Sequence, residues 1–190
     1  EALAGRCSTI AVSINADESV SIADDGHGIP VGINSQTKMP AVTMVFCDLH
    51  AGGKFDNKAY NVSGGLHGIG LKAVNALSEW TEVEVQIDGG LYHQRYSRGK
   101  KVTELKKLGP TNGHGTKVTF KADAEIFQES TTFHYATIAA RLRELAFLCK
   151  GVRIKLTDQR GDEKKDEEFY YADGIKEFVA WHNRNKTKIN

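Results

Sequence analysis

Cysteine, proline and long apolar runs are all scarce in this sequence. Its 190 residues include three cysteines and three prolines. Because the cysteines are odd in number, widely spaced and never arranged as Cys-x-x-Cys, a disulfide framework and a zinc site are both disfavoured. No run approaches the roughly 18 apolar residues of a membrane span, and no signal peptide begins the chain. We therefore expect a cytoplasmic protein with no membrane partner.

An excess of charge of either sign is also lacking. Lysine and arginine number 25 and aspartate and glutamate 24, which gives a net charge of +1. Proteins that hold nucleic acid usually show a strong basic excess. If this protein works on DNA, its main DNA-binding surface should lie outside this sequence. The hydrophobic fraction of 40% and the charged fraction of 26% are ordinary for a globular domain with a buried core.

Hydrophobic patterning predicts an α+β fold. Alternating or β-branched segments predict strands over residues 9–14, 20–23, 82–87, 91–96, 115–120, 152–157 and 168–171. Helical spacing predicts helices over 41–49, 71–77 and 135–148, and a last helix capped by Asp173. The buried face of the third helix should hold Ile138, Leu142, Leu145 and Leu148. We expect a two-layer sandwich, in which helices cover one face of a mixed, mostly antiparallel sheet.

The charged run 160–167 most simply predicts a solvated turn.

Asp24 is the first residue with a candidate chemical role, because it ends a predicted strand just before Gly26 and Gly28. Beside apolar Ile22 and Ile29, its carboxylate could accept a hydrogen bond from the 6-amino group of adenine. Guanine presents an acceptor at that position, so Asp24 would select ATP over GTP by about 1.5–3 kcal/mol. Asp-Asp-Gly is equally a common turn sequence, and the motif alone does not separate the two interpretations.

Glycines before the second predicted helix suggest a phosphate site. Gly65-Leu66-His67-Gly68-Ile69-Gly70 leads directly into that helix, whose free N–H groups and positive dipole end suit a phosphate. The pattern alone is weak, and it matches neither the dinucleotide fingerprint nor the P-loop. Six glycines within 52–70 predict a loop rather than a packed element.

Two further residue types fit a bound nucleotide. Lys54 follows Gly52 and Gly53, and a lysine on such a hinge can reach a terminal phosphate. Thr116 follows Gly115 at a predicted strand start, where its hydroxyl could hold a water against a base edge. Taken singly, an exposed lysine and a strand threonine are commonplace.

Together, three stretches carry a family resemblance. They read DDGHGIP at 24–30, LHAGGKF at 49–55, and VSGGLHGIG through VNALS at 62–78. They resemble the GHKL ATPase family shared by gyrase, a ninety-kilodalton heat-shock chaperone, histidine kinases and the mismatch-repair protein MutL. The type IIA topoisomerase branch is the most similar, and RLRELAFL at 141–148 and GIKEFV at 174–179 look like gyrase B-type chains. The resemblance extends over essentially the whole sequence.

The resemblance implies one ATP-binding domain over residues 1–190, followed by a transducer domain, with ATP and Mg²⁺ as cofactors. In such proteins ATP binding dimerises two B subunits, which work with gyrase A subunits in an A₂B₂ assembly on DNA. The whole protein would be an ATP-hydrolysing type II topoisomerase that drives supercoiling by strand passage. The alternatives are a topoisomerase IV B-type subunit, or a module that binds nucleotide without turnover.

By the same resemblance, the nucleotide would contact three groups of residues. Adenine would meet Asp24, Gly28, Ile29 and Thr116 within an apolar pocket of Ile22, Ile29, Val45, Leu71 and Val118. A lid over 52–70 would close on the nucleotide, with Lys54 on the γ-phosphate beside Gly52 and Gly53. The phosphates would be cradled by backbone N–H groups of Gly65, Leu66, His67, Gly68, Ile69 and Gly70.

The sequence also departs from the family pattern. The general-base Glu and the Mg²⁺-ligand Asn of the family would both fall upstream of residue 1, so we expect weak nucleotide binding and no hydrolysis by this chain. The family usually has Arg where His27 and Ile87 stand. Both arginines help to hold aminocoumarin inhibitors, so binding of these inhibitors should be weaker than in typical gyrases.

Overall fold

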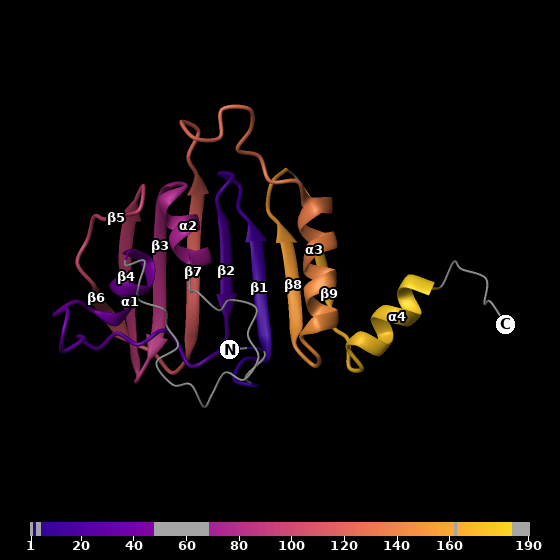
Figure 1. The fold of residues 1–190 in the computed structure, drawn as a ribbon, viewed down its shortest axis with the longest axis horizontal. Helices are drawn as coiled ribbons and strands as arrows, with labels where there is room; N and C mark the ends of the chain where they lie inside the picture. Colours follow the sequence, from indigo (N-terminus) through magenta and orange to yellow (C-terminus); the bar gives the residue numbers. More distant parts are fainter. Residues whose placement is uncertain (1, 3–4, 48–68, 162, 184–190) are drawn as a thin grey trace.

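The computed structural model describes residues 2, 5–47, 69–161 and 163–183. Within these ranges, nine strands and four helices form one mixed sheet and a helical layer (Figure 1). The strands are β1 (Thr9–Ile14), β2 (Val20–Asp24), β3 (Ser78–Ile87), β4 (Gly90–Ser97), β5 (Lys100–Lys101), β6 (Lys106–Pro110), β7 (Gly115–Ala122), β8 (Arg153–Asp158) and β9 (Lys165–Phe169). The helices are α1 (Ala41–Cys47), α2 (Ile69–Ala76), α3 (Tyr135–Leu148) and α4 (Ile175–Asn183).

The sheet runs in the order β5-β4-β3-β7-β2-β1-β8-β9, and β6 also pairs with β4. Among the described strands, β1 and β8 pair in parallel and all other pairs are antiparallel. The predicted mixed, mostly antiparallel sheet is therefore confirmed. Hairpins join β1 to β2 and β3 to β4, with Ile14 opposite Val20 and Ile87 opposite Gly90.

α1, α2 and α3 cover one face of this sheet, whereas α4 packs against α3 beyond the β9 edge (Figure 1). A row of paired residues crosses the middle strands, running Val83, Val118, Ile22, Val12 and Leu156. Side chains at paired positions point to the same face of a sheet, so this apolar row marks the covered face. At its β3 end the row packs against α1 and α2, and at its β8 end against α3. The predicted two-layer arrangement is confirmed.

The opposite face of the sheet is polar. Ion pairs join neighbouring strands there, with Lys117 Nζ 3.1 Å from Glu84 and an Arg153 nitrogen 2.9 Å from Glu168. Such exposed pairs stabilise the fold by no more than about 1 kcal/mol each. None of the helices in the described ranges combines the length and the apolar character that crossing a membrane requires.

The buried face of α3 differs from the prediction. Leu145 and Leu148 are 48% and 59% exposed, although Ile138 and Leu142 do pack against the core as expected. Ala146 and Phe147 occupy the buried side instead. The small alanine permits close approach to the sheet, and Phe147 stacks on Tyr171 with ring centres 3.6 Å apart. Leucine spacing alone therefore predicted the wrong rotation of the helix.

Two smaller predictions also need correction. Part of the charged run forms β9, where Thr157 donates a hydrogen bond of 2.6 Å to Asp166, so the run is not simply a turn. At the start of α4, the backbone N–H of Asp173 donates to the Glu177 carboxylate at 2.7 Å. Among the hydrogen bonds of the described residues, the Asp173 carboxylate accepts none from the first turn of α4, so the predicted cap is not present.

Candidate functional site

Asp24 and Thr116 lie opposite each other at the adjoining ends of β2 and β7. Two residues further along, Ile22 is opposite Val118. Because side chains alternate along a strand, all four point to the helix-covered face. Thr116 is only 8% exposed, and its hydroxyl oxygen accepts a hydrogen bond of 3.1 Å from the backbone N–H of Ile29. A carboxylate and a hydroxyl therefore stand together at the rim of an apolar wall.

Two glycines make this arrangement possible. Gly115 has φ +125°, and a Cβ there would lie 2.0 Å from the carbonyl oxygen of Asp24. Gly28 has φ +83°, and a Cβ there would lie 2.8 Å from the carbonyl oxygen of Gln86. Neither contact distance is possible for a carbon atom. The missing side chains let the loop after Asp24 press against the ends of β3 and β7.

Hydrogen bonds fix the same loop. The backbone N–H of Gly26 donates to Asp24 Oδ1 at 2.8 Å, which holds the carboxylate in one orientation. The imidazole of His114 donates from Nδ1 to the carbonyl oxygen of Gly26 at 2.8 Å, which requires the tautomer protonated at Nδ1. The loop is thus connected both to β2 and to the turn before β7.

The neighbouring carboxylate, Asp25, has a different role. It accepts hydrogen bonds from the backbone N–H groups of Ser8 and Thr9 at 2.7 and 2.9 Å, and another from the Ser8 hydroxyl. Burial opposes ionisation, but these bonds and one from Cys7 outweigh it and hold the pKa of Asp25 well below its usual range. Burial, with Asp25 next, raises the pKa of the Cys7 thiol to about 11. Asp25 is therefore a structural anion that ties the loop to β1.

Four of the five residues predicted to line an apolar pocket beside Asp24 pack against one buried cluster. Ile29, Val45, Leu71 and Val118 all pack against the buried cluster beneath α1 and α2. Ile22, the fifth predicted residue, is 41% exposed on the same face. It belongs to β2, which lies between α2 and α3 in Figure 1. The wall therefore continues from a buried cluster to an accessible apolar surface.

The N-terminus of α2 forms the other side of the site. Ile69 and Gly70 open this helix and Leu71 follows, with Ile69 52% exposed. A Cβ on Gly70 would meet no atom of the described residues within 4 Å, so packing alone does not require glycine there. The remaining predicted residues, Gly52, Gly53, Lys54, Gly65, Leu66, His67 and Gly68, lie outside the described residues.

Comparison with known proteins identifies the family. Residues 2–126 match the family described as "Histidine kinase-, DNA gyrase B-, and HSP90-like ATPase". The chain belongs to this ATPase family. It is 54% identical over 189 residues to the DNA gyrase B subunit of Clostridium acetobutylicum, covering 100% of this chain and 29% of that protein. It is 49% identical over 191 residues to the DNA topoisomerase 4 B subunit of Staphylococcus epidermidis, with the same coverage of 100% and 29%.

A solved structure agrees with this assignment. The 43K ATPase domain of Thermus thermophilus gyrase B, crystallised with an aminocoumarin, superposes with a TM-score of 0.85 at 34% identity. The match covers 100% of this chain and 47% of that one. The chain thus spans about three tenths of its gyrase B relative from Clostridium and about half of the solved domain. The resemblance to the type IIA branch of the ATPase family is confirmed, together with the fold.

A buried polar network that the sequence did not predict joins α1 to β4. The side-chain oxygen of Gln94 accepts hydrogen bonds from the hydroxyls of Thr43 and Tyr96 at 2.9 and 2.8 Å. Gln94 also donates to the carbonyl oxygen of Thr103 at 3.1 Å. Burial raises the pKa of Tyr96 well above its usual range, so its hydroxyl stays a donor. The sequence pattern that could have revealed this network is a glutamine at an inward-facing position of a strand, between two tyrosines.

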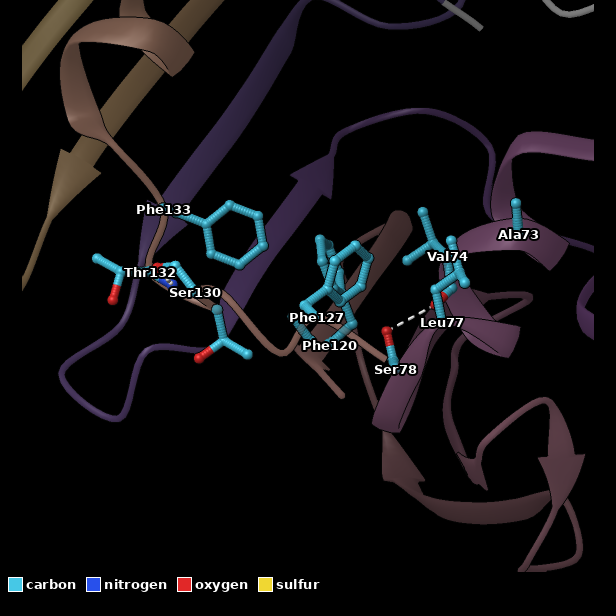
Figure 2. Close-up of a pocket in the computed structure, with 11 residues that line it drawn as sticks. Ala73, Val74, Leu77, Ser78, Phe120, Phe127, Ser130, Thr132 and Phe133 are labelled. Carbon is cyan, nitrogen blue, oxygen red and sulfur yellow. Dashed lines mark hydrogen bonds between the residues drawn. The ribbon is translucent and has the colours of Figure 1, made fainter. Parts of the chain in front are cut away.

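One well-formed cavity of this ATPase domain lies away from Asp24. It has a volume of about 350 Å³ and sits at the far end of β7, between α2 and the segment after that strand (Figure 2). Its walls include Val74, Leu77, Phe120, Phe127 and Phe133. Because no lining residue is charged, this cavity does not suit a phosphate. Among the described residues, no three His, Cys, Asp or Glu side chains gather as metal ligands.

Proposed function

We propose that this chain is the ATP-binding domain of a bacterial gyrase-type B subunit. The whole protein would use ATP to supercoil DNA by strand passage, with residues 1–190 as one domain and a transducer domain after it. The observation that carries the proposal is the pairing of Asp24 with Thr116 beside an apolar wall. Several relatives of this ATPase family that match the chain are DNA gyrase B subunits.

The base is recognised by Asp24 and Thr116. The Asp24 carboxylate accepts a hydrogen bond from the 6-amino group of adenine, and Thr116 supports the ring through a water. Ile29, Leu71 and Val118 contact the faces of the base. Guanine would place a carbonyl oxygen against the carboxylate and lose a charge-assisted bond of about 1.5–3 kcal/mol. The site therefore selects ATP over GTP.

The phosphates are bound at the N-terminus of α2. Glycine at position 70 leaves the space beside the first helical turn open, and the free N–H groups there favour an anion. As the resemblance implies, Leu66 to Gly68 and Lys54 complete the contacts to the phosphates. Mg²⁺, when bound, neutralises phosphate charge.

In the whole protein, the proposed partners are a gyrase A subunit, DNA and a second copy of the B-type chain. A topoisomerase IV B-type subunit is the second candidate, because such a protein from Staphylococcus epidermidis is 49% identical to this chain. The two candidates share the nucleotide site and differ in the A-type subunit that they bind. Pull-down with purified gyrase A and topoisomerase IV A-type subunits separates them.

The nucleotide site is tested by calorimetric titration with a non-hydrolysable ATP analogue and Mg²⁺. We expect Asp24→Asn to weaken binding roughly 10- to 150-fold, the equivalent of one charge-assisted hydrogen bond. The matched control is Asp88→Asn, which makes the same charge change on the exposed turn between β3 and β4. Circular dichroism shows whether each sample is folded.

The proposal requires that Asp24→Asn weaken nucleotide binding more than Asp88→Asn does. Equal affinities of the two variants, or a folded parent chain that binds the GTP analogue as well as the ATP analogue, would remove Asp24 from the adenine site. A folded parent chain that binds neither analogue would contradict the assignment of these 190 residues as sufficient for binding.

A further inference from the structure

One segment is strongly basic, although the net charge of the whole chain is near zero. Between residues 90 and 110 there are six basic side chains, Arg95, Arg98, Lys100, Lys101, Lys106 and Lys107, and one acidic side chain, Glu104. The segment thus carries a net charge of +5, although the whole chain carries +1. Four of these residues, Lys100, Lys101, Lys106 and Lys107, are referred to below as the lysine edge.

The fold places the lysine edge along one border of the sheet. β5 and β6 both pair with β4 on the side away from β3, so they form two parts of one interrupted edge (Figure 1). The register sets Lys100 opposite Ser97, Lys101 opposite Tyr96, Lys106 opposite His93 and Lys107 opposite Tyr92. Alternation along the strands then directs two of the four lysines to each face. All four are exposed.

Only one lysine of the edge is paired with a carboxylate in the part of the chain that the structure describes. Lys101 forms an ion pair of 2.6 Å with Glu104. Within the described residues, no carboxylate lies within 4 Å of the ammonium groups of Lys100, Lys106 or Lys107. The Lys107 ammonium lies 5.8 Å from the ring centre of Tyr92, which is a weak contact at an exposed site. The positive charge of the edge is therefore mostly uncompensated.

Lysines on an edge strand also prevent sheets from pairing with one another. Here the two pairs of lysines are three to four β4 residues apart, or about 10–13 Å, which spans roughly three to four base pairs of B-form DNA. Protein interfaces are depleted of lysine at their centres, whereas lysine is a common phosphate ligand. Val102 and Leu108 are exposed nearby as single apolar residues.

We propose that the lysine edge binds the phosphate backbone of duplex DNA without sequence preference. This inference rests on the proposed function, which makes DNA the substrate of the whole protein. The contact is a supplementary one, since the chain as a whole has almost no net charge. It would hold duplex DNA along the border of the nucleotide-binding domain, at the opposite end of the sheet from α4 (Figure 1).

The test uses the 190-residue chain and a fluorescein-labelled duplex of about 20 base pairs, with fluorescence anisotropy measured over a series of salt concentrations. The edge variant carries Lys100→Gln, Lys106→Gln and Lys107→Gln. The control variant carries Lys38→Gln, Lys164→Gln and Lys176→Gln, which are exposed and remove the same charge elsewhere. We expect the edge variant to bind at least tenfold more weakly at about 50 mM salt. Its slope of log K against log salt should be shallower by about 2–3, while the control retains the parent slope.

Several results would overturn the proposal. They are an absence of binding by the parent chain at about 50 mM salt, an equal loss in both variants, and no loss in either. Poly-glutamate serves as a probe for an acidic protein partner, and edge-dependent binding of poly-glutamate without binding of the duplex would also overturn it. Nucleotide titration of the same samples separates this failure from failure of the proposed function, because neither variant alters the Asp24 site.

Discussion

Replacing Gly115 with alanine should destabilise the fold and weaken the proposed nucleotide site beside Asp24. The new Cβ would lie 2.0 Å from the carbonyl oxygen of Asp24 and 3.2 Å from the Cα of Asp25. Both neighbours are backbone atoms, so no flexible side chain can move aside. Either β7 or the end of β2 must shift by about 1 Å, because carbon and oxygen need roughly 3 Å or more.

The magnitude has two parts. A residue other than glycine held at φ +125° costs about 1–3 kcal/mol in backbone strain. Relieving the contact by moving packed strands adds about 1–3 kcal/mol, so a total loss of about 2–6 kcal/mol is expected. Gly151→Ala is the matched control, because φ is +76° there and a Cβ would meet no atom of the described residues within 4 Å. It should lose only about 1–2 kcal/mol.

Urea unfolding followed by circular dichroism measures both variants, and calorimetric titration measures nucleotide binding by each. Gly115→Ala should also bind nucleotide more weakly at temperatures where it remains folded, because Asp24 is displaced. Gly151→Ala should bind as the parent does. The reasoning is refuted if the two variants lose equal stability, or if Gly115→Ala binds nucleotide normally.

Three further predictions follow from the structure. The depressed pKa of Asp25 means that its contribution to stability is present above the unfolded value of about 3.9 and is lost as pH falls towards the folded value. Asp25→Asn should therefore lower stability at pH 7 by about 1–2 kcal/mol and flatten the acid limb of a melting-temperature profile. Gln94→Met should lower the free energy of unfolding by about 2–4 kcal/mol, since it leaves two buried hydroxyls unpaired, and denaturant titration would show it. Arginine at both His27 and Ile87 in a full-length gyrase-type B chain should tighten novobiocin binding in a calorimetric titration, and an unchanged affinity would end that idea.

Local pattern predicted the elements well. β1 and α3 begin and end at the predicted residues, because alternation and helical spacing are intrinsic to each segment. The rotation of α3 was not predictable in the same way, since it depends on how closely Ala146 approaches the sheet. β5 and β6 were missed because they are short, rich in lysine and stabilised by pairing with β4 rather than by burial.

In the candidate site too, some features were predictable from the local sequence and others depended on contacts between distant residues. Asp24 and Thr116 were singled out from the sequence because their residue types suit a nucleotide, and the apolar wall came from the family resemblance; their roles in binding stay predictions. The role of Asp25 was not predictable from the sequence. It depends on Ser8 and Thr9, which lie 17 and 16 positions before Asp25 and come close only after β1 pairs with β2. Distant contacts of this kind leave no local signal.

The parallel pairing of β1 with β8 constrains how this domain can fold during synthesis. β8 begins about 140 residues after β1 ends, so the ribosome needs roughly 7–28 s to supply the partner strand. Until then, one edge of the first hairpin has open hydrogen-bonding groups, and an apolar row remains uncovered by α3. Contacts between such distant segments also form slowly, because a long loop must close first. A nascent chain that ends near residue 126 would thus expose an unpaired strand edge to neighbouring chains. A chaperone would bind the chain during the interval before β8 is synthesised.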